Sequence, residues 1–294
     1  MANKIVTKKQ LSENVFRMTL EAPRIAATRK AGQFVIVRAE SEWSERIPLT
    51  IADANVALGT IDIIFQTVGV STKRLSLLEV GDSVADLVGP LGRPTEIAAC
   101  REAIVVGGGI GIAPAHPIAQ AFKAAGAHVT AILGARQANL IIMEDEMRRA
   151  SDEVIVMTDD GSAGRAGLVT IPLVEKLEAL QRAGGEAALQ SCRVVLVGPP
   201  IMMKFAAAAT RPFGVKTIAS LNAIMIDGTG MCGGCRVTVG GETKFVCVEG
   251  PEFDAHAVDF DNFILRLGAF RAQEAEHRCR SGLFGSGMTK DGTK

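Results

Sequence analysis

Residues 103–114 read Ala103-Ile-Val-Val-Gly107-Gly-Gly-Ile-Gly111-Ile-Ala-Pro114. The apolar start of this segment predicts a buried strand, and the alanine-rich stretch that follows, up to Ala125, predicts a helix. Between a strand and a helix, glycines let backbone N–H groups approach a pyrophosphate at the helix N-terminus. The spacing differs from the standard G-x-G-x-x-G, so a tight strand-to-helix connection is the alternative to a nucleotide site. The candidate residues of the turn are Gly107, Gly108, Gly109 and Gly111.

Strands and helices alternate on the C-terminal side of this turn. The predicted strands lie at 129–134, 154–158 and 192–198, with helices at 144–149 and 173–182. Such alternation predicts a doubly wound parallel sheet, which we assign to residues 99–219. Ligands bind at the carboxyl ends of the strands in such sheets. Two further strand ends are therefore candidate nucleotide-binding segments, Thr158-Asp-Asp-Gly-Ser162 and Gly198-Pro199.

The N-terminal third of the chain has a different pattern. Short alternating or β-branched runs are separated by Gly, Pro and polar turns, and they lie at 15–20, 33–38, 60–66 and 83–88. This rhythm predicts an antiparallel barrel or sandwich over residues 1–98, of which we adopt the barrel, with one or two helical turns at 72–78.

Two segments of the predicted barrel offer groups that suit a nucleotide. The first is Arg46-Ile-Pro48-Leu49-Thr50, where a planar guanidinium could hold two phosphate oxygens and the threonine hydroxyl could reach a flavin ring. A surface arginine before a proline turn is the alternative. The second is the loop Gly69-Val-Ser71-Thr72, which offers N–H groups and hydroxyls at a helix start. An ordinary helix cap would use the same residues.

The most specific pattern lies near the C-terminus. Asp227-Gly-Thr-Gly-Met-Cys232-Gly-Gly-Cys235 is followed by Cys247 after a short strand-like segment. The plant-type two-iron pattern is C-x4-C-x2-C…C, and Asp227 stands where its first cysteine would be. We interpret Asp227, Cys232, Cys235 and Cys247 as ligands of a [2Fe–2S] cluster. A structural zinc site is the main alternative, and a disulfide is the weakest.

Composition restricts the partners and the compartment. The 294 residues carry zero net charge, and 22% of them are charged, without a basic run. Neither a nucleic acid nor a membrane is therefore expected as a partner. The chain start lacks an apolar signal region, which favours a cytoplasmic location. Cys100, Cys192 and Cys279 are expected to be ordinary thiols.

The order of these features resembles the ferredoxin–NADP reductase superfamily, in which a flavin-binding barrel precedes a nicotinamide domain. Arg46, Pro48, Thr50, the glycine turn and Gly198-Pro199 carry the resemblance. A cluster motif after the nicotinamide domain narrows it to the branch that holds the electron-transfer subunits of dihydroorotate dehydrogenase and the small subunits of NADH-dependent ferredoxin:NADP oxidoreductase, or sulfide dehydrogenase. With Asp227 in the first ligand position, the chain looks more like the second group.

The resemblance implies a three-part fold and an electron-transfer function. FAD would be held by the Arg46–Thr50 segment and the Gly69–Thr72 loop, and NAD(H) by the glycine turn with Asp160, Gly161 and Gly198; NADP(H) is not excluded. Electrons would pass from NADH through the flavin to the cluster and on to a larger flavin and iron–sulfur partner subunit, with ferredoxin served indirectly. No catalytic acid or base is implied.

The sequence is also compatible with other partners and with other functions. The partner could instead process dihydroorotate, sulfide or polysulfide. A zinc-bound redox sensor and a diaphorase with a vestigial cluster loop are further readings. Glu144 and Glu146 are expected on a solvated helix face, and His116 is expected to pack at a helix start. The cluster module should span 220–280, with a helix at 259–278 and a flexible tail at 281–294.

Overall fold

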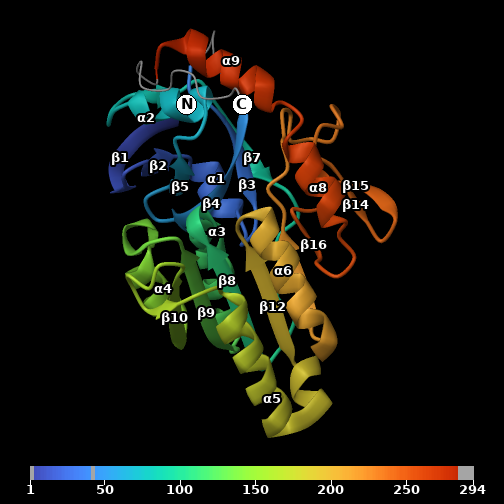
Figure 1. Ribbon diagram of the computed structural model, residues 1–294. Helices are drawn as coiled ribbons and strands as arrows, with labels where there is room; N and C mark the ends of the chain where they lie inside the picture. Colours follow the sequence, from blue (N-terminus) through green and yellow to red (C-terminus); the bar gives the residue numbers. More distant parts are fainter. Residues whose placement is uncertain (1–2, 41–43, 284–294) are drawn as a thin grey trace.

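The computed structural model describes residues 3–40 and 44–283. Its described part contains an antiparallel barrel, a mainly parallel sheet and a smaller C-terminal module, and Figure 1 shows the barrel above the parallel sheet with the module beside both. The fold class expected from the sequence is confirmed.

The barrel consists of seven strands in the order β6-β1-β2-β5-β4-β3-β7, and neighbouring strands are antiparallel. Its elements are β1 (Asn3–Ser12), β2 (Val15–Glu21), α1 (Pro23–Thr28), β3 (Phe34–Arg38), β4 (Ile47–Asn55), β5 (Thr60–Gln66), α2 (Val70–Leu77), β6 (Ser83–Val84) and β7 (Asp86–Leu91). Residues 83–88, expected as one strand, form parts of two. Val84 pairs with β1 at one edge, whereas Asp86 pairs with β3 at the other, so this segment nearly closes the barrel.

The second sheet has the order β11-β10-β9-β8-β12-β13-β16. Its elements up to residue 220 are β8 (Glu102–Gly108), a 3-10 turn (Gly109–Gly111), α3 (Ile112–Ala124), β9 (His128–Ala135), α4 (Glu144–Ala150), β10 (Glu153–Thr158), β11 (Arg165–Ala166), α5 (Thr170–Gln190), β12 (Cys192–Val197), α6 (Pro200–Thr210) and β13 (Lys216–Ser220). The strand order reverses between β8 and β12, which lie side by side. In open parallel sheets, ligands bind at this reversal, outside the carboxyl ends of the strands.

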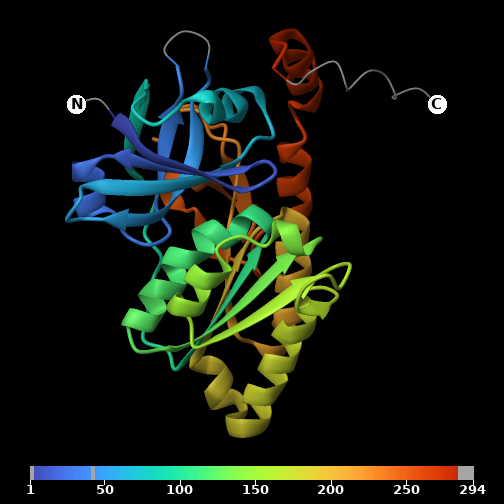
Figure 2. The same cartoon turned by 90° about the vertical axis from the view of Figure 1, so that its left-hand side faces the viewer.

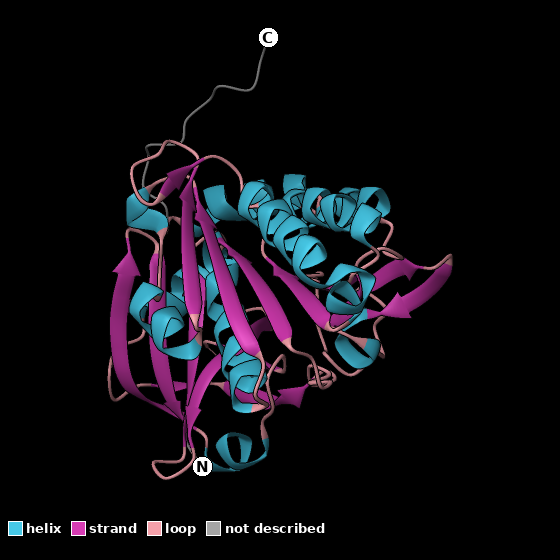
Figure 3. Ribbon diagram, turned by 90° about the horizontal axis from the view of Figure 1, so that it is seen from below, coloured by secondary structure: helices cyan, strands magenta, loops and turns pink. Residues whose placement is uncertain are grey.

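Helices cover both faces of the parallel sheet, as the view from below shows (Figure 3). Ala103 and Val105 of β8 pack with α3 and α4, whereas Ile104 and Val106 pack with α5 and α6. Because successive side chains of a strand point to opposite faces, a continuous apolar run is what a central strand between two helix layers requires.

The C-terminal module begins after β13. It contains β14 (Arg236–Val239), β15 (Glu242–Phe245), α7 (Val246–Glu249), β16 (Glu252–Asp254), α8 (Phe260–Leu267) and α9 (Arg271–Ser281). The strand β16 pairs antiparallel with β13, so the module extends the parallel sheet by one edge strand. From the sequence pattern, we propose unit boundaries near residues 98 and 219. Because β16 returns to pair with β13, the C-terminal module stays connected to the parallel sheet beyond the second boundary.

The expectation of one helix at 259–278 is wrong. Asp259 caps α8 by accepting a hydrogen bond from the Asn262 N–H at 3.0 Å, but α8 ends before Gly268 and a new helix begins at Arg271. This break lets α9 run along the barrel, where it contacts α2 (Figure 2). Of the tail expected at 281–294, Ser281 ends α9, and residues from 284 onward lie outside the described residues.

Candidate functional site

A cavity of about 1090 Å³ lies where the barrel, the strand reversal and the C-terminal module meet. Small-molecule sites usually measure roughly 300–1,000 Å³, so this space is large enough for an extended dinucleotide. Of the residues predicted from the sequence, the cavity is lined by Pro48, Leu49, Thr50, Thr72, Gly108, Gly109, Gly111, Gly198 and Pro199.

The barrel contributes the start of β4 and the start of α2 to this cavity. Arg46, predicted as a phosphate ligand, does not line it; its side chain is half exposed, and its guanidinium lies 3.1 Å from the Asp86 carboxylate. Gly69 and Thr72 bond to each other, since the Gly69 N–H donates to the Thr72 hydroxyl at 3.1 Å. Ser71 is buried beside them. The hydrogen bond between Gly69 and Thr72 is that of an ordinary helix cap, although Thr72 also lines the cavity.

The glycine turn is packed tightly against the end of β12. A Cβ atom on Gly111 would overlap the carbonyl oxygen of Val197 and lie 2.7 Å from the Cα of Gly198. Gly107 does not line the cavity, because it packs against Ile112, whose Cα would lie 2.9 Å from an added Cβ. Gly109 has φ +55 and open space around it. The turn thus brings bare backbone to the cavity at the N-terminal end of α3.

Only part of the segment predicted at the end of β10 lines the cavity. Asp160 and Gly161 lie outside the lining, whereas the preceding Asp159 is part of it, as is Arg136, which follows β9. Hydrogen bonds from the Ser162 hydroxyl and N–H hold the pKa of Asp160 below its usual range. Asp159 is therefore the carboxylate of this segment that lines the cavity.

Sequence reasoning missed the segment that connects the cavity with the cluster loop. Ser220, Leu221, Asn222, Ala223 and Met225 all line the cavity. Ser220 ends β13, a five-residue strand between α6 and the glycine-rich loop, and the other four residues follow this strand. The run Val215-Lys-Thr-Ile-Ala-Ser220 carried a weak alternating signal that would have located it. The cavity thus leads, within two residues, to Asp227.

The four predicted cluster ligands form two pairs. The Cys232 sulfur lies 3.1 Å from Oδ1 of Asp227, and the Cys235 sulfur lies 3.2 Å from the Cys247 sulfur. Cys232 is exposed, whereas Cys235 and Cys247 are buried. A two-iron cluster takes two protein ligands on each iron, so two neighbouring pairs fit it.

The same arrangement does not favour a zinc ion. A structural zinc site gathers four ligands around one point. Among the residues that the structure describes, no three His, Cys, Asp or Glu side chains are grouped closely enough to hold one ion. The donors present therefore match a two-centre cluster better than a single tetrahedral metal.

The two ligand pairs differ in the pKa shifts of their members. Hydrogen bonds from Cys232, the Thr229 hydroxyl and the Met231 N–H hold the pKa of Asp227 well below its usual range. Burial, with a contribution from the adjacent Cys235, raises the pKa of the Cys247 thiol to about 12. Removing a proton from this buried thiol is therefore unfavourable in the protein alone, and a bound metal would compensate by taking the thiolate as a ligand.

Glycines shape the loop that carries these donors. Gly228, Gly230 and Gly233 adopt φ values of +75, +89 and +66, which side-chain-bearing residues rarely adopt. A Cβ on Gly228 would also lie 2.8 Å from the Ile36 side chain of the barrel. The N–H groups of Gly234 and Cys247 point at sulfur, 3.5 Å from Cys232 and 3.4 Å from Cys235 respectively. Such N–H donors are the interactions that tune a cluster.

The remaining cysteines behave as ordinary thiols. Burial raises the pKa of Cys192 to about 12 in the core of the parallel sheet, Cys100 is half-buried, and Cys279 is exposed on α9.

Two family models match the chain. Residues 222–259 match the iron–sulfur cluster binding domain of dihydroorotate dehydrogenase B, and residues 105–208 match the oxidoreductase NAD-binding domain. The first match contains all four predicted cluster ligands, and the second contains the glycine turn and Gly198.

Whole-chain comparisons agree with these matches. The chain is 46% identical over 272 residues to a Thermotoga maritima protein named dihydroorotate dehydrogenase B (NAD(+)), electron transfer subunit homolog, covering 92% of this chain and 93% of that protein. It is 30% identical to the electron transfer subunit of dihydroorotate dehydrogenase B from Streptococcus mutans, with 87% and 97% covered. A chain of the solved NADH-dependent reduced ferredoxin-NADP oxidoreductase, described in connection with flavin-based electron bifurcation, is 44% identical, with a TM-score of 0.86 and coverage of 96% and 98%.

Proposed function

Because the chain belongs to the family of dihydroorotate dehydrogenase B electron-transfer subunits and their homologs, we propose that it carries electrons between NAD(H), FAD and a [2Fe–2S] cluster, and from there to or from a larger partner subunit. The continuous cavity carries this proposal, because one wall is the barrel, one is the glycine turn at the strand reversal, and one leads into the cluster loop.

FAD, when bound, would supply the exchange between the two-electron chemistry of NADH and the one-electron chemistry of an iron–sulfur cluster. The chain's own residues bind and orient. Pro48 to Thr50 and Thr72 would hold the flavin side, and Gly108, Gly109 and Gly111 would hold the dinucleotide. Asp227, Cys232, Cys235 and Cys247 would hold the cluster.

The cluster loop supports a proposal for the type of partner. Asp227 stands in the first ligand position, and the chain is similar over nearly its whole length to a chain of the NADH-dependent ferredoxin-NADP oxidoreductase. We therefore propose a larger flavin and iron–sulfur subunit of that type, with a dihydroorotate- or sulfide-processing subunit as the second candidate. Met231 is 89% and Ile226 56% exposed on the same loop, which leaves an apolar surface beside the cluster ligands for a partner.

Cofactor content tests the function directly. Protein purified without oxygen is expected to hold about two iron atoms, with matching acid-labile sulfide, and about one FAD per chain. NADH should bleach the flavin and produce the electron paramagnetic resonance signal of a reduced two-iron cluster, and Asp227→Ala should change that signal. Stoichiometric zinc with no visible colour would refute the proposal and favour the redox-sensor reading.

The partner is identified by a separate experiment. The tagged chain is recovered with its partner from its own cells, and two reactions are compared. Reduction of NADP+ that requires both NADH and reduced ferredoxin supports the ferredoxin type. Reduction of NAD+ by dihydroorotate would replace it with the second candidate.

We also propose that the nicotinamide site selects NAD(H). Carboxylates near a ribose accept hydrogen bonds from a 2′-hydroxyl and repel a 2′-phosphate. Asp159 lines the cavity with Asp160 next to it, so two carboxylates stand near Arg136, the cation in this part of the lining. Asp159→Ser is expected to raise kcat/KM for NADPH relative to NADH about tenfold or more. Flavin reduction by each nucleotide measures this ratio. Asp152→Asn, before the opposite end of β10, is the control, and an unchanged ratio in Asp159→Ser would contradict this assignment.

A further inference from the structure

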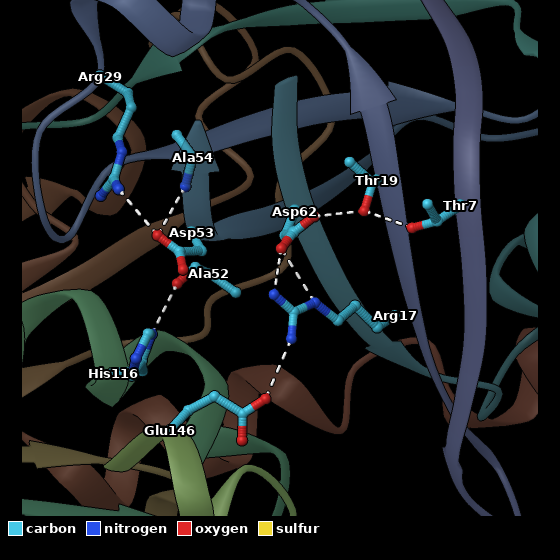
Figure 4. A network of polar contacts seen from close by, with 10 residues as sticks. All are labelled: Thr7, Arg17, Thr19, Arg29, Ala52, Asp53, Ala54, Asp62, His116 and Glu146. Atoms are coloured by element: carbon cyan, nitrogen blue, oxygen red, sulfur yellow. Dashed lines mark hydrogen bonds and ion pairs between the residues drawn. The ribbon is translucent and has the colours of Figure 1, made fainter. Parts of the chain in front are cut away.

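The barrel and the parallel sheet are also joined by polar contacts away from the main cavity (Figure 4). Arg17 of β2 bonds to Asp62 of β5 and reaches across to α4, where its Nη1 donates to Oε1 of Glu146 at 3.2 Å. Asp62 is itself fixed, because it accepts a hydrogen bond from the Thr19 hydroxyl at 2.6 Å. Glu146, expected on a solvated face, therefore connects the two units, whereas Glu144 pairs with Arg148 on its own helix.

A second contact joins the elements that carry the two halves of the main cavity. The Nδ1 of His116 lies 3.2 Å from the carbonyl oxygen of Ala52, and His116 is only 3% exposed. A carbonyl can only accept, so this nitrogen must carry the proton. His116 lies in the second turn of α3, the helix that follows the glycine turn. Ala52 lies two residues beyond Thr50 on β4.

These polar contacts lie beside an apolar contact between the units and next to a cleft. Val15, Ala52 and Ile64 of the barrel pack with α3 and form an apolar contact between the units. Next to it lies a separate polar cavity of about 440 Å³, whose lining includes Asp53, His116 and Glu146. The apolar contact between the units ends at this cleft. The hydrogen bond and the ion pair join the units at two further points beside it.

On the basis of the proposed hydride transfer from NADH to FAD, we propose that His116 and the Arg17–Glu146 pair are positioning residues that set the distance between bound nicotinamide and flavin without touching either one. Hydride transfer needs reacting atoms about 3–3.5 Å apart, and a displacement of about 1 Å can slow a reaction about 100-fold. The α3 helix places the dinucleotide turn, and β4 places Pro48 to Thr50. A rotation between these elements changes the gap directly.

Rapid-mixing measurements of flavin reduction by NADH test this role. His116→Leu is expected to lower the limiting rate at saturating NADH about tenfold, with Kd for NADH changed less than about twofold. His116→Asn can place an amide N–H near the position of Nδ1, so it should restore most of the rate. Glu146→Gln should lower the rate about threefold, while Glu144→Gln, on the same helix, should leave it unchanged.

NADH deuterated at the transferred position shows whether the hydride step is the one measured. A purely structural role would lower the thermal unfolding midpoint and leave the limiting rate of the folded, FAD-loaded protein unchanged, and that result would overturn the proposal. An increase in Kd without a change in limiting rate would also overturn it. If His116→Leu does not fold, the comparison of Glu146→Gln with Glu144→Gln decides by the same two readouts.

Discussion

Replacing Cys235 with alanine is expected to remove the cluster and to stop electron transfer to the partner, while leaving the flavin in place. The Cys235 sulfur lies 3.2 Å from that of Cys247, and a two-iron cluster that loses one of four ligands has an iron without its thiolate. Iron and sulfide should fall to background. NADH-driven reduction of the partner should fall at least about 100-fold, because in the proposed function the cluster carries the electrons from the flavin to the partner. Reduction of a small dye by NADH should persist.

Cys192 supplies the matched control. It is as buried as Cys235, so removing its sulfur has a similar packing cost, but it lies in the core of the parallel sheet, outside the cluster loop. Cys192→Ala should keep its iron and its partner-directed activity. Full iron content in Cys235→Ala would show that the ligand set is wrong. Loss of dye reduction together with loss of iron would show instead that the variant no longer binds its flavin.

The central elements were predictable because their signals are local. The buried run at 103–106 and the glycine turn after it form β8 and the start of α3, and the antiparallel rhythm before residue 98 forms the barrel. The segments missed or merged depend on distant partners. β16 exists because Ser220 lies opposite Glu252 across the sheet edge, and residues 83–88 divide because their two halves pair with opposite edges of the barrel.

In the candidate site too, some features have a local sequence signal and others depend on the fold. Spacing in the chain indicated Asp227, Cys232, Cys235 and Cys247, but only the fold sorts them into two pairs. No short pattern marks Asp159 rather than Asp160 as the residue that lines the cavity, because one step along a loop turns a side chain away. The ion pair between Arg17 and Glu146 joins residues 129 positions apart, which a local sequence pattern cannot show. The helical pattern around Glu146 therefore predicted a solvent-exposed side chain.

Glu252 should make the free energy of unfolding fall as pH rises from about 5 to 8. Burial raises the pKa of Glu252 from 4.5 to about 7, although a hydrogen bond from the Thr95 hydroxyl at 2.6 Å partly opposes the shift. A Cβ on Gly32 would lie 2.8 Å from its Oε1, so the carboxyl group is closely surrounded. None of the ion pairs found among residues 3–40 and 44–283 includes Glu252.

The direction follows from proton binding. Between pH 4.5 and 7 the native chain holds a proton on Glu252 that the unfolded chain has lost, so the native state is favoured at low pH. This contribution is complete below the unfolded pKa and is lost as pH rises through the folded one. A shift of this size corresponds to at most about 3 kcal/mol, reduced by whatever solvent reaches the group.

Glu252→Gln isolates the effect, because its neutral side chain keeps the shape and can still accept from Thr95. Chemical denaturation at pH 5 and pH 8 should give similar unfolding free energies for wild type and variant at the lower pH, and a more stable variant at the higher pH. Glu242→Gln is the control: Lys244 lowers the pKa of this exposed carboxyl, so its removal cannot produce a gain at high pH. If wild type and Glu252→Gln lose stability in parallel between the two pH values, the carboxyl is ionised throughout. The contact between Thr95 and β16 would then be an ordinary hydrogen bond to a carboxylate, and the link between the barrel and the cluster module would not depend on pH.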